Sequence, residues 1–190
     1  DSIWVGNDPS GTTNTAQYNV AVGTTAFDAA TTGDGNVAIG YGALTAGDTC
    51  EDTVAIGYNA LAAITGNSDN TAVGDLALTA TTGSNNVGIG SSAGAGNTSG
   101  GHNVYIGKVA GATGSGGNNI AIGHQALTAN TADSNTAIGY KALKANTSAA
   151  QNTAVGYQAL DATTGGYNTA IGFEAGGANV TGTFNTFVGQ

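Results

Sequence analysis

Basic residues, cysteine and long apolar runs are scarce in this sequence, and each scarcity excludes a class of protein. Three lysines and no arginine in 190 residues cannot neutralise a phosphate backbone, so we expect no nucleic acid partner. The single cysteine, Cys50, supports neither an internal disulfide framework nor a cysteine zinc site. No apolar run approaches the roughly 18 residues needed to span a membrane. Charged residues make up only 8% of the chain, and this low charge together with many Gly, Ser, Thr and Asn residues is also typical of low-complexity disorder.

The order of the residues argues against disorder, because one short motif recurs along the whole chain. The pentapeptide Asn-(Thr/Val)-Ala-(Ile/Val)-Gly, or a close variant, ends at a glycine in each of twelve units spaced by 16 or 17 residues. These glycines are Gly6, Gly23, Gly40, Gly57, Gly74, Gly90, Gly107, Gly123, Gly139, Gly156, Gly172 and Gly189. A repeat that holds its phase throughout leaves no room for a second domain. We therefore predict a single repeat domain over residues 1–190.

The first half of each repeat predicts a short β-strand. Val or Ile precedes the glycine in all twelve units, and Val, Ile or Thr lies two residues earlier. β-branched residues two apart point to the same side of a strand. The residue between them is small, and it is Ala in eight units. A second segment, typically Tyr-x-Ala-Leu, follows the glycine and is predicted to form a second short strand before a polar turn.

A unit this short cannot bury its own apolar side, so it must stack on its neighbours. Helical repeats need about 33 residues or more, and the β-branched columns disfavour helix. We therefore predict an all-β fold, a β-solenoid of about twelve coils of 16 or 17 residues. Both columns of the first strand are apolar, so one face should line the coil and the other should meet a partner.

Stacking turns each column of the sequence into a ladder in space. Asn opens ten of the twelve strands, and its amide can bond both local backbone and the next coil. The strand-ending glycine is predicted to adopt a positive φ or to allow close backbone approach. The structural ladder residues are Asn36, Ile39, Gly40, Asn70, Val73, Gly74, Asn135, Ile138, Gly139, Asn152, Val155 and Gly156. Trp4 and Phe187 occupy the small column in the first and last units and are predicted to be end plugs, unless the chain is part of a longer array and their positions are accidental.

Two stretches carry a resemblance to a known family. Asn152-Thr-Ala-Val-Gly-Tyr-Gln-Ala-Leu160 and Asn135-Thr-Ala-Ile-Gly-Tyr-Lys-Ala-Leu143 resemble the YadA-like head repeats of trimeric autotransporter adhesins and the related repeats of phage tail fibres. The resemblance implies a left-handed parallel β-roll and a homotrimer around one axis. It also implies an extracellular location, on a cell surface or a virion. The repeat here is longer than that of adhesin heads, and no anchor barrel, stalk or chaperone segment is recognisable.

No arrangement of residues indicates catalysis, so we do not expect an enzyme. His102 and His124 lie in different columns, and acidic neighbours disfavour a reactive thiolate at Cys50. Neither Gly-rich stretch, 94–101 or 111–117, has the spacing of a phosphate-binding loop. We expect no cofactor, with calcium at acidic turn residues as the one candidate, although no calcium motif is present. The acidic turn residues are Asp34, Asp48, Asp52, Asp69 and Asp133.

One column is a candidate binding ladder. The residue after the glycine is aromatic in several units, and these residues are Tyr41, Tyr58, His124, Tyr140, Tyr157 and Phe173. If they project from one edge, they suit sugar stacking or contact with a protein. The alternative is that the rings cover the turn and pack against each other.

The sequence thus predicts an extracellular fibrous protein, structural or adhesive, that forms a trimeric shaft or head segment of a surface adhesin or phage tail fibre. Its partners would be further copies of itself and, at the surface it attaches to, a host glycan or protein. One alternative is an ice-binding β-solenoid, although the exchange of Thr with Val in one column points to a buried or half-buried position. Another is a shaft that polymerises end to end through its open strand edges. Residues 1–75 hold nine acidic residues and no lysine, whereas residues 76–190 hold three of each.

Overall fold

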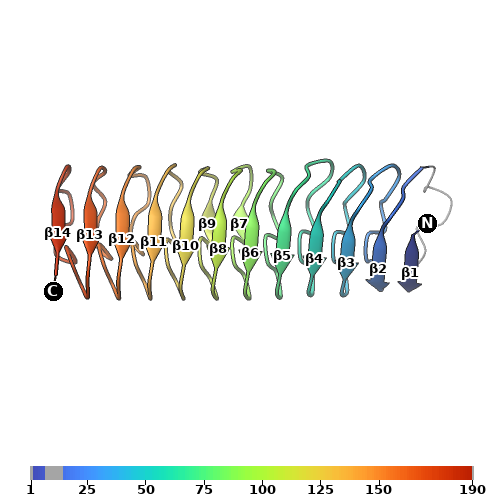
Figure 1. Cartoon of the computed structure of the whole chain (residues 1–190), viewed down its shortest axis with the longest axis horizontal. Coiled ribbons are helices and arrows are strands. Elements are labelled where there is room, and N and C mark those ends of the chain that lie inside the picture. The colour runs from blue at the N-terminus through green and yellow to red at the C-terminus, as the bar shows by residue number, and fades with distance from the viewer. Residues whose placement is uncertain (1, 7–14, 190) are drawn as a thin grey trace.

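The chain winds into an elongated β-solenoid with its two ends at opposite ends of a rod (Figure 1). The computed structural model describes residues 2–6 and 15–189. The described residues contain no helix and form one parallel sheet of twelve strands. These strands are β1 (Ile3–Gly6), β2 (Val20–Gly23), β3 (Val37–Ile39), β4 (Val54–Ile56), β5 (Thr71–Val73), β6 (Val87–Ile89), β8 (Val104–Ile106), β10 (Ile120–Ile122), β11 (Thr136–Ile138), β12 (Thr153–Val155), β13 (Thr169–Ile171) and β14 (Thr186–Val188).

The predicted all-β solenoid is therefore confirmed, with one strand of the large sheet for each repeat. The winding has about ten turns rather than the predicted twelve coils. The difference arises at the ends, because residues 7–14 of the first repeat lie outside the described residues and the last repeat holds little more than β14.

Successive strands pair in register, so that each residue lies beside its counterpart in the next repeat. In the pairing of β3 with β4, Val37 lies opposite Val54 and Ala38 opposite Ala55. Every neighbouring pair in the sheet, from β1 with β2 to β13 with β14, repeats this alignment of columns. A shift of one residue would exchange the two faces of a strand, because side chains alternate along it.

The two faces of the sheet have different environments, and the small column is the inner one. Ala38 and Ala55 are completely buried inside the coil, whereas Ile39 on the opposite face of β3 is 37% exposed. The same alternation recurs along the sheet. The β-branched face therefore points outward in the single chain, which the sequence left undecided.

The Tyr-x-Ala-Leu segment is not a second strand, and that expectation was wrong. Its second and fourth residues have left-handed backbone, as at Asn59 (φ 49°) and Leu61 (φ 51°). Neighbouring coils still bond here, and the N–H of Leu44 donates to the carbonyl of Ala60 at 2.9 Å. The only strands outside the large sheet among the described residues are the two-residue β7 (Gly96–Asn97) and β9 (Thr113–Gly114), which pair with each other.

Left-handed backbone at leucine is strained by about 1–2 kcal/mol per residue, so burial must compensate for it. The side chains of Leu44, Leu61 and Leu78 are completely buried and, with the inward Ala column, form the core. Burial of a leucine contributes about 1.5–3 kcal/mol. Most coils are therefore held by a large inward side chain and by hydrogen bonds to the neighbouring coils.

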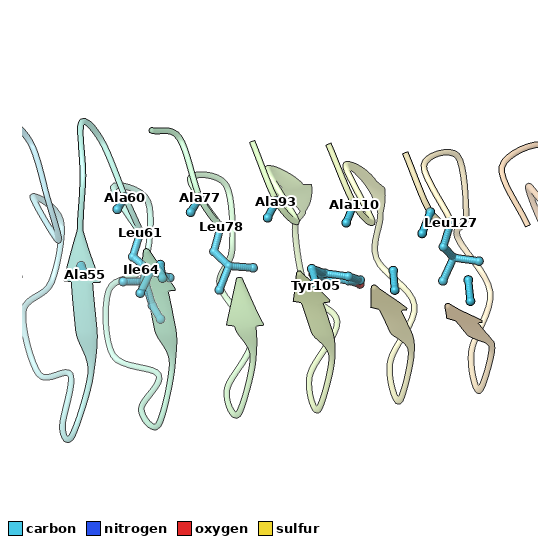
Figure 2. Close-up of a cluster of buried hydrophobic side chains, with 14 of the residues drawn as sticks. Ala55, Ala60, Leu61, Ile64, Ala77, Leu78, Ala93, Tyr105, Ala110 and Leu127 are labelled. Carbon is cyan, nitrogen blue, oxygen red and sulfur yellow. The ribbon is translucent and has the colours of Figure 1, made fainter. Parts of the chain in front are cut away.

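At one place in the rod the large inward residue is on the strand and the small one is in the Leu column, the reverse of the usual arrangement. Tyr105 replaces Ala in the small column, and glycine replaces Leu at Gly94 in the preceding repeat and at Gly111 in the same repeat. A Cβ on Gly94 would lie 2.5 Å from the Tyr105 ring, and one on Gly111 would lie 2.1 Å from it. Figure 2 shows Tyr105 in the same row as Leu78 and Leu127. The tyrosine ring fills the space that the missing leucines leave.

The strand-ending glycines are required by the stacking of the coils. Those in the described residues have φ between +109° and +141°. A Cβ on Gly40 would lie 2.6 Å from the carbonyl oxygen of Gly57 in the next coil. Both the backbone conformation and the close approach therefore exclude a side chain.

Both aromatic residues of the terminal strands turn toward the core. Trp4 stacks on Phe27 with ring centroids 5.7 Å apart, and both Trp4 and Phe187 are partly buried against the core. Phe187 is accommodated like Tyr105, because a Cβ on Gly176 would lie 2.7 Å from its ring. That Trp4 and Phe187 act as end plugs stays a prediction.

Replacement of a strand-ending glycine should destabilise the rod. We expect Gly139→Ala to lower the free energy of unfolding by more than about 2 kcal/mol, because Gly139 has φ +136° and its Cβ would lie 2.2 Å from the carbonyl oxygen of Gly156. Chemical denaturation followed by circular dichroism measures the loss. Gly177→Ala is the matched control, because its nearest backbone contact is 3.1 Å and its φ is not positive. An equal loss in both variants would contradict this explanation.

The exchange of bulk between Tyr105 and Gly111 should appear as coupling in a double-mutant cycle. Tyr105→Ala leaves a cavity and should cost about 3 kcal/mol. Gly111→Leu should also destabilise, because the new side chain would overlap the ring, whereas the left-handed backbone (φ 54°) accepts leucine elsewhere in this column. The double variant restores the usual Ala and Leu arrangement and should lose less than the sum of the two single variants. Additive losses would show that the two sites are independent.

Candidate functional site

The asparagine column forms a buried ladder of amides along the rod. Asn103 shows the pattern: its backbone N–H and its Nδ2 donate to Oδ1 of Asn86 at 3.0 and 3.1 Å, and its own Oδ1 accepts the N–H of Asn119 at 2.8 Å. Its Nδ2 also donates to the carbonyl of Gly116 at 3.0 Å. The Asn ladder positions Asn36, Asn70, Asn135 and Asn152 are likewise fully buried. The predicted bonding from coil to coil is present, and each amide joins two coils.

A second set of asparagines closes the turn opposite the sheet, and sequence reasoning missed its role. The Oδ1 of Asn146 accepts the N–H of Ala149 at 3.1 Å, and its Nδ2 donates to the carbonyl of the same residue at 2.8 Å. Asn97 makes the same pair of bonds with Gly100. Each amide thus behaves like a short piece of strand. The signal was present as Asn seven residues after a strand-ending glycine, in Asn97, Asn130, Asn146 and Asn179.

The candidate binding ladder consists of two separate stacks. Tyr41 and Tyr58 form one stack, with ring centroids 5.5 Å apart and planes 12° apart. His124, Tyr140, Tyr157 and Phe173 form the other, with successive centroid distances of 5.6, 5.2 and 5.0 Å. Asp75, Ser91 and Lys108 occupy the column between the two stacks.

The rings project into solvent and also pack against each other, so the two alternatives predicted for this column are both present. Tyr41 is 54% and Tyr157 43% exposed. Both faces of Tyr140 and of Tyr157 are covered by neighbouring rings. A sugar ring stacks on an aromatic face, and these inner rings offer a partner their edges and hydroxyl groups instead. The Lys141 ammonium lies 4.9 Å from the centroid of Tyr140, and contact with Tyr140 raises the pKa of Lys141.

A further aromatic stack lies at the other end of the strands and was not predicted. Tyr167 and Phe184 precede the ladder asparagines of the last two coils, and their ring centroids are 4.7 Å apart. They are 52% and 77% exposed. Tyr18 occupies the same column near the other end of the rod and is 71% exposed. The sequence does carry a signal for this column, because the residue directly before the ladder asparagine is aromatic at Tyr18, Tyr167 and Phe184.

The outward face of the large sheet is a continuous aliphatic surface that runs along the rod. Its two columns are Val, Ile or Thr, and no strand in the described residues contains a charged residue. Exposure is substantial along the whole rod, as at Ile39 (37%), Ile89 (39%) and Ile171 (47%). With a strand spacing of about 4.8 Å, twelve three-residue strands cover roughly 50 by 10 Å. This is the size of the largest apolar patches found on monomeric proteins.

The titratable residues that the sequence singled out are not brought together. Cys50 is a completely buried free thiol, and burial, with the nearby charge of Asp48, raises its pKa to about 11. His124 lies in the aromatic stack, and His102 is exposed in a turn. In the described part of the chain, no three His, Cys, Asp or Glu side chains gather at one point, and no pocket is present. Residues 2–6 and 15–189 also contain no helix able to cross a membrane.

Removal of one ladder amide should destabilise the rod most where two coils depend on it. We expect Asn103→Ala to cost about 3 kcal/mol of unfolding free energy, because it leaves the N–H of Asn119 and the carbonyl of Gly116 without these buried partners. Asn185→Ala is the control, because Asn185 is only partly buried and lies in the last repeat. Thermal and chemical denaturation compare the two. Equal losses of unfolding free energy in the two variants would contradict the idea that the buried partners of Asn103 make its amide more important than that of Asn185.

Comparison of the chain with protein family models, with curated proteins and with solved structures gave no match. The solenoid fold and its surfaces therefore rest on the chain's own residues.

Proposed function

We propose that this chain is a segment of an extracellular fibrous protein, structural or adhesive, that acts by self-assembly into a stiff rod and by attachment to a surface. The observation that carries the proposal is the uncharged outward face of the large sheet. It runs from β1 to β14, and along it Ile39, Ile89 and Ile171 stay at least 37% exposed in the single chain. A patch of this size, bounded by polar turns, is typical of a protein interface.

The occupant of this face is further copies of the same chain. Its two β-branched columns are straight and continuous, because every strand pairs in register with the next. A second rod presents an identical surface of the same length and lack of charge. The number three comes from the resemblance to YadA-like heads, in which each chain packs against two others around one axis. The left-handed sense of the roll is proposed on the same ground.

The narrow core of the single chain gives a physical reason for association. Among its inward side chains, most are alanines, and in most coils a single leucine or phenylalanine supplies the bulk. Repeats of this kind gain stability chiefly from their neighbours. Burial of the outward isoleucines and valines would add about 25 cal/mol for each Å² removed from water.

The acidic residues of the first half of the chain are placed where they would oppose aggregation of the fibres. Asp28, Glu51, Asp52, Asp69 and Asp75 are exposed and lie outside the strands, in the first half of the chain. They leave the sheet face apolar while giving the turns of that half one sign of charge. Like charges on the outside of a rod oppose side-by-side aggregation.

An ice-binding solenoid is the second candidate, and one observation favours it. The column that contains Thr136, Thr153, Thr169 and Thr186 lies on the outward face, and Thr186 is exposed in the single chain. The exchange of Thr with Val in this column had indicated a buried or half-buried position, and Thr136, Thr153 and Thr169 are half-buried. A flat, regular and weakly charged face could order water in place of a second chain. Measurable thermal hysteresis would favour this candidate, and its absence together with a trimer would favour the fibre.

The assembly is tested by the mass of the particle in solution and by one charge on its face. Light scattering should give three times the chain mass of 18.2 kDa. Ile89→Lys places a charge in the middle of the outward face and should shift the particle toward single chains. Ser148→Lys is the charge-matched control, because Ser148 is exposed in a turn, and it should leave the mass unchanged. A stable, well-folded single chain at micromolar concentration would contradict the trimer.

A further inference from the structure

The seven tyrosines of this chain fall into three groups with different surroundings. Tyr41 stacks on Tyr58, and Tyr140 stacks on Tyr157, so four of the seven have another tyrosine as a neighbour. Tyr105 is buried in the core. Tyr167 stacks on a phenylalanine, and Tyr18, which is 71% exposed, stacks on no ring among the residues that the structure describes. Only the first group brings two phenol rings together at the surface.

The two tyrosine pairs share one geometry. Their ring centroids are 5.5 and 5.2 Å apart, and their planes are 12° and 13° apart. All four rings are between 38% and 54% exposed. Each pair joins adjacent coils, because its members are one repeat apart. The backbone bonds between coils hold the members of a pair together, as where the N–H of Gln158 donates to the carbonyl of Tyr140 at 2.9 Å.

We propose that Tyr41–Tyr58 and Tyr140–Tyr157 are two sites of oxidative cross-linking, at which a one-electron oxidant of the peroxidase class joins adjacent coils through a dityrosine bond. Each phenol loses one electron and one proton and becomes a phenoxyl radical. The two radicals combine through the ring carbons beside the oxygens, and the hydrogen on each of these carbons then moves as a proton, through water, to the oxygen of the same ring, which restores both phenols and leaves a net loss of two hydrogen atoms. The two electrons and two protons reduce one hydrogen peroxide to two waters.

Proximity makes this coupling selective. Two radicals held within one stack meet far more often than radicals on separate molecules, because the encounter is intramolecular. The exposed rings are accessible to an oxidant and need only small side-chain rotations to bring their edges together. The in-register stacking of the coils keeps the two rings of each pair next to each other, as it does for like side chains in other stacks of parallel strands.

The composition gives the cross-link a structural role. The chain has one cysteine, and it is buried, so no disulfide can form within the chain. Disulfides are the usual covalent reinforcement of secreted proteins. A dityrosine bond would supply an equivalent link across one coil and would restrict the unfolded chain in the same way. This inference rests on positions within one chain and not on the proposed trimer.

The experiment oxidises the folded chain with a peroxidase and hydrogen peroxide and maps the linked peptides by mass spectrometry. We expect two links, Tyr41–Tyr58 and Tyr140–Tyr157, each with the loss of two hydrogen atoms. Their yield should exceed that of the denatured chain by on the order of ten-fold. The oxidised rod should also unfold at a higher denaturant concentration than the untreated one.

Phenylalanine variants provide matched controls, because a phenylalanine stacks in this column but has no phenol. Phe173 already stacks on Tyr157 at 5.0 Å. Tyr157→Phe should lose only the second link, Tyr58→Phe only the first, and the double variant both. Tyr18→Phe should change neither. Links that involve Tyr18, Tyr105 or Tyr167 at comparable yield, or equal yields from folded and denatured chains, would overturn the proposal, as would the absence of dityrosine when free tyrosine couples under the same conditions.

Discussion

Hydrogen bonding in register between successive coils is the constraint on which the rest of this structure depends. It places each residue beside its counterpart one repeat away, so that Asn lies on Asn, Gly on Gly and Tyr on Tyr. The distance between coils is set by the backbone and cannot adapt to the side chains. Each column therefore favours residues that tolerate a copy of themselves at that distance. Amides can bond along the stack, aromatic rings can lie parallel, and glycines allow two backbones to approach.

The interior follows from the same constraint. A coil of 16 or 17 residues encloses little space, and its inward positions are filled mainly by alanine and one leucine or phenylalanine. Leucine is retained there in left-handed backbone, because its burial outweighs the local strain. Where glycine relieves that strain, at Gly94 and Gly111, the ring of Tyr105 supplies the missing volume from the opposite wall. At this place in the rod the core is filled by a different residue from the opposite wall.

The outside of the rod carries two surfaces of different character. The outward face of the large sheet is aliphatic and uncharged, and it suits contact with a copy of the same surface. The aromatic stacks lie beyond the ends of the strands and present their edges, because neighbouring rings cover the faces of the inner ones. The proposed assembly uses the first surface and the proposed cross-links use the second. The two proposals are therefore independent, and the failure of one leaves the other standing.

The sequence by itself determined the solenoid, because a repeat of constant phase with β-branched columns has one way to bury its apolar side. It also determined the asparagine ladder and the strand-ending glycines, since glycine ends all twelve units and asparagine opens ten of the strands. It could not show that the small column faces inward, because both columns are apolar and alternation alone does not choose a side. It also placed a second strand at Tyr-x-Ala-Leu, where the left-handed conformation of Asn59 and Leu61 forms a series of turns. That conformation, the pairing of Tyr105 with two glycines and the division of the aromatic column into two stacks were decided only by the tertiary structure, because each depends on contacts between coils that no single repeat contains.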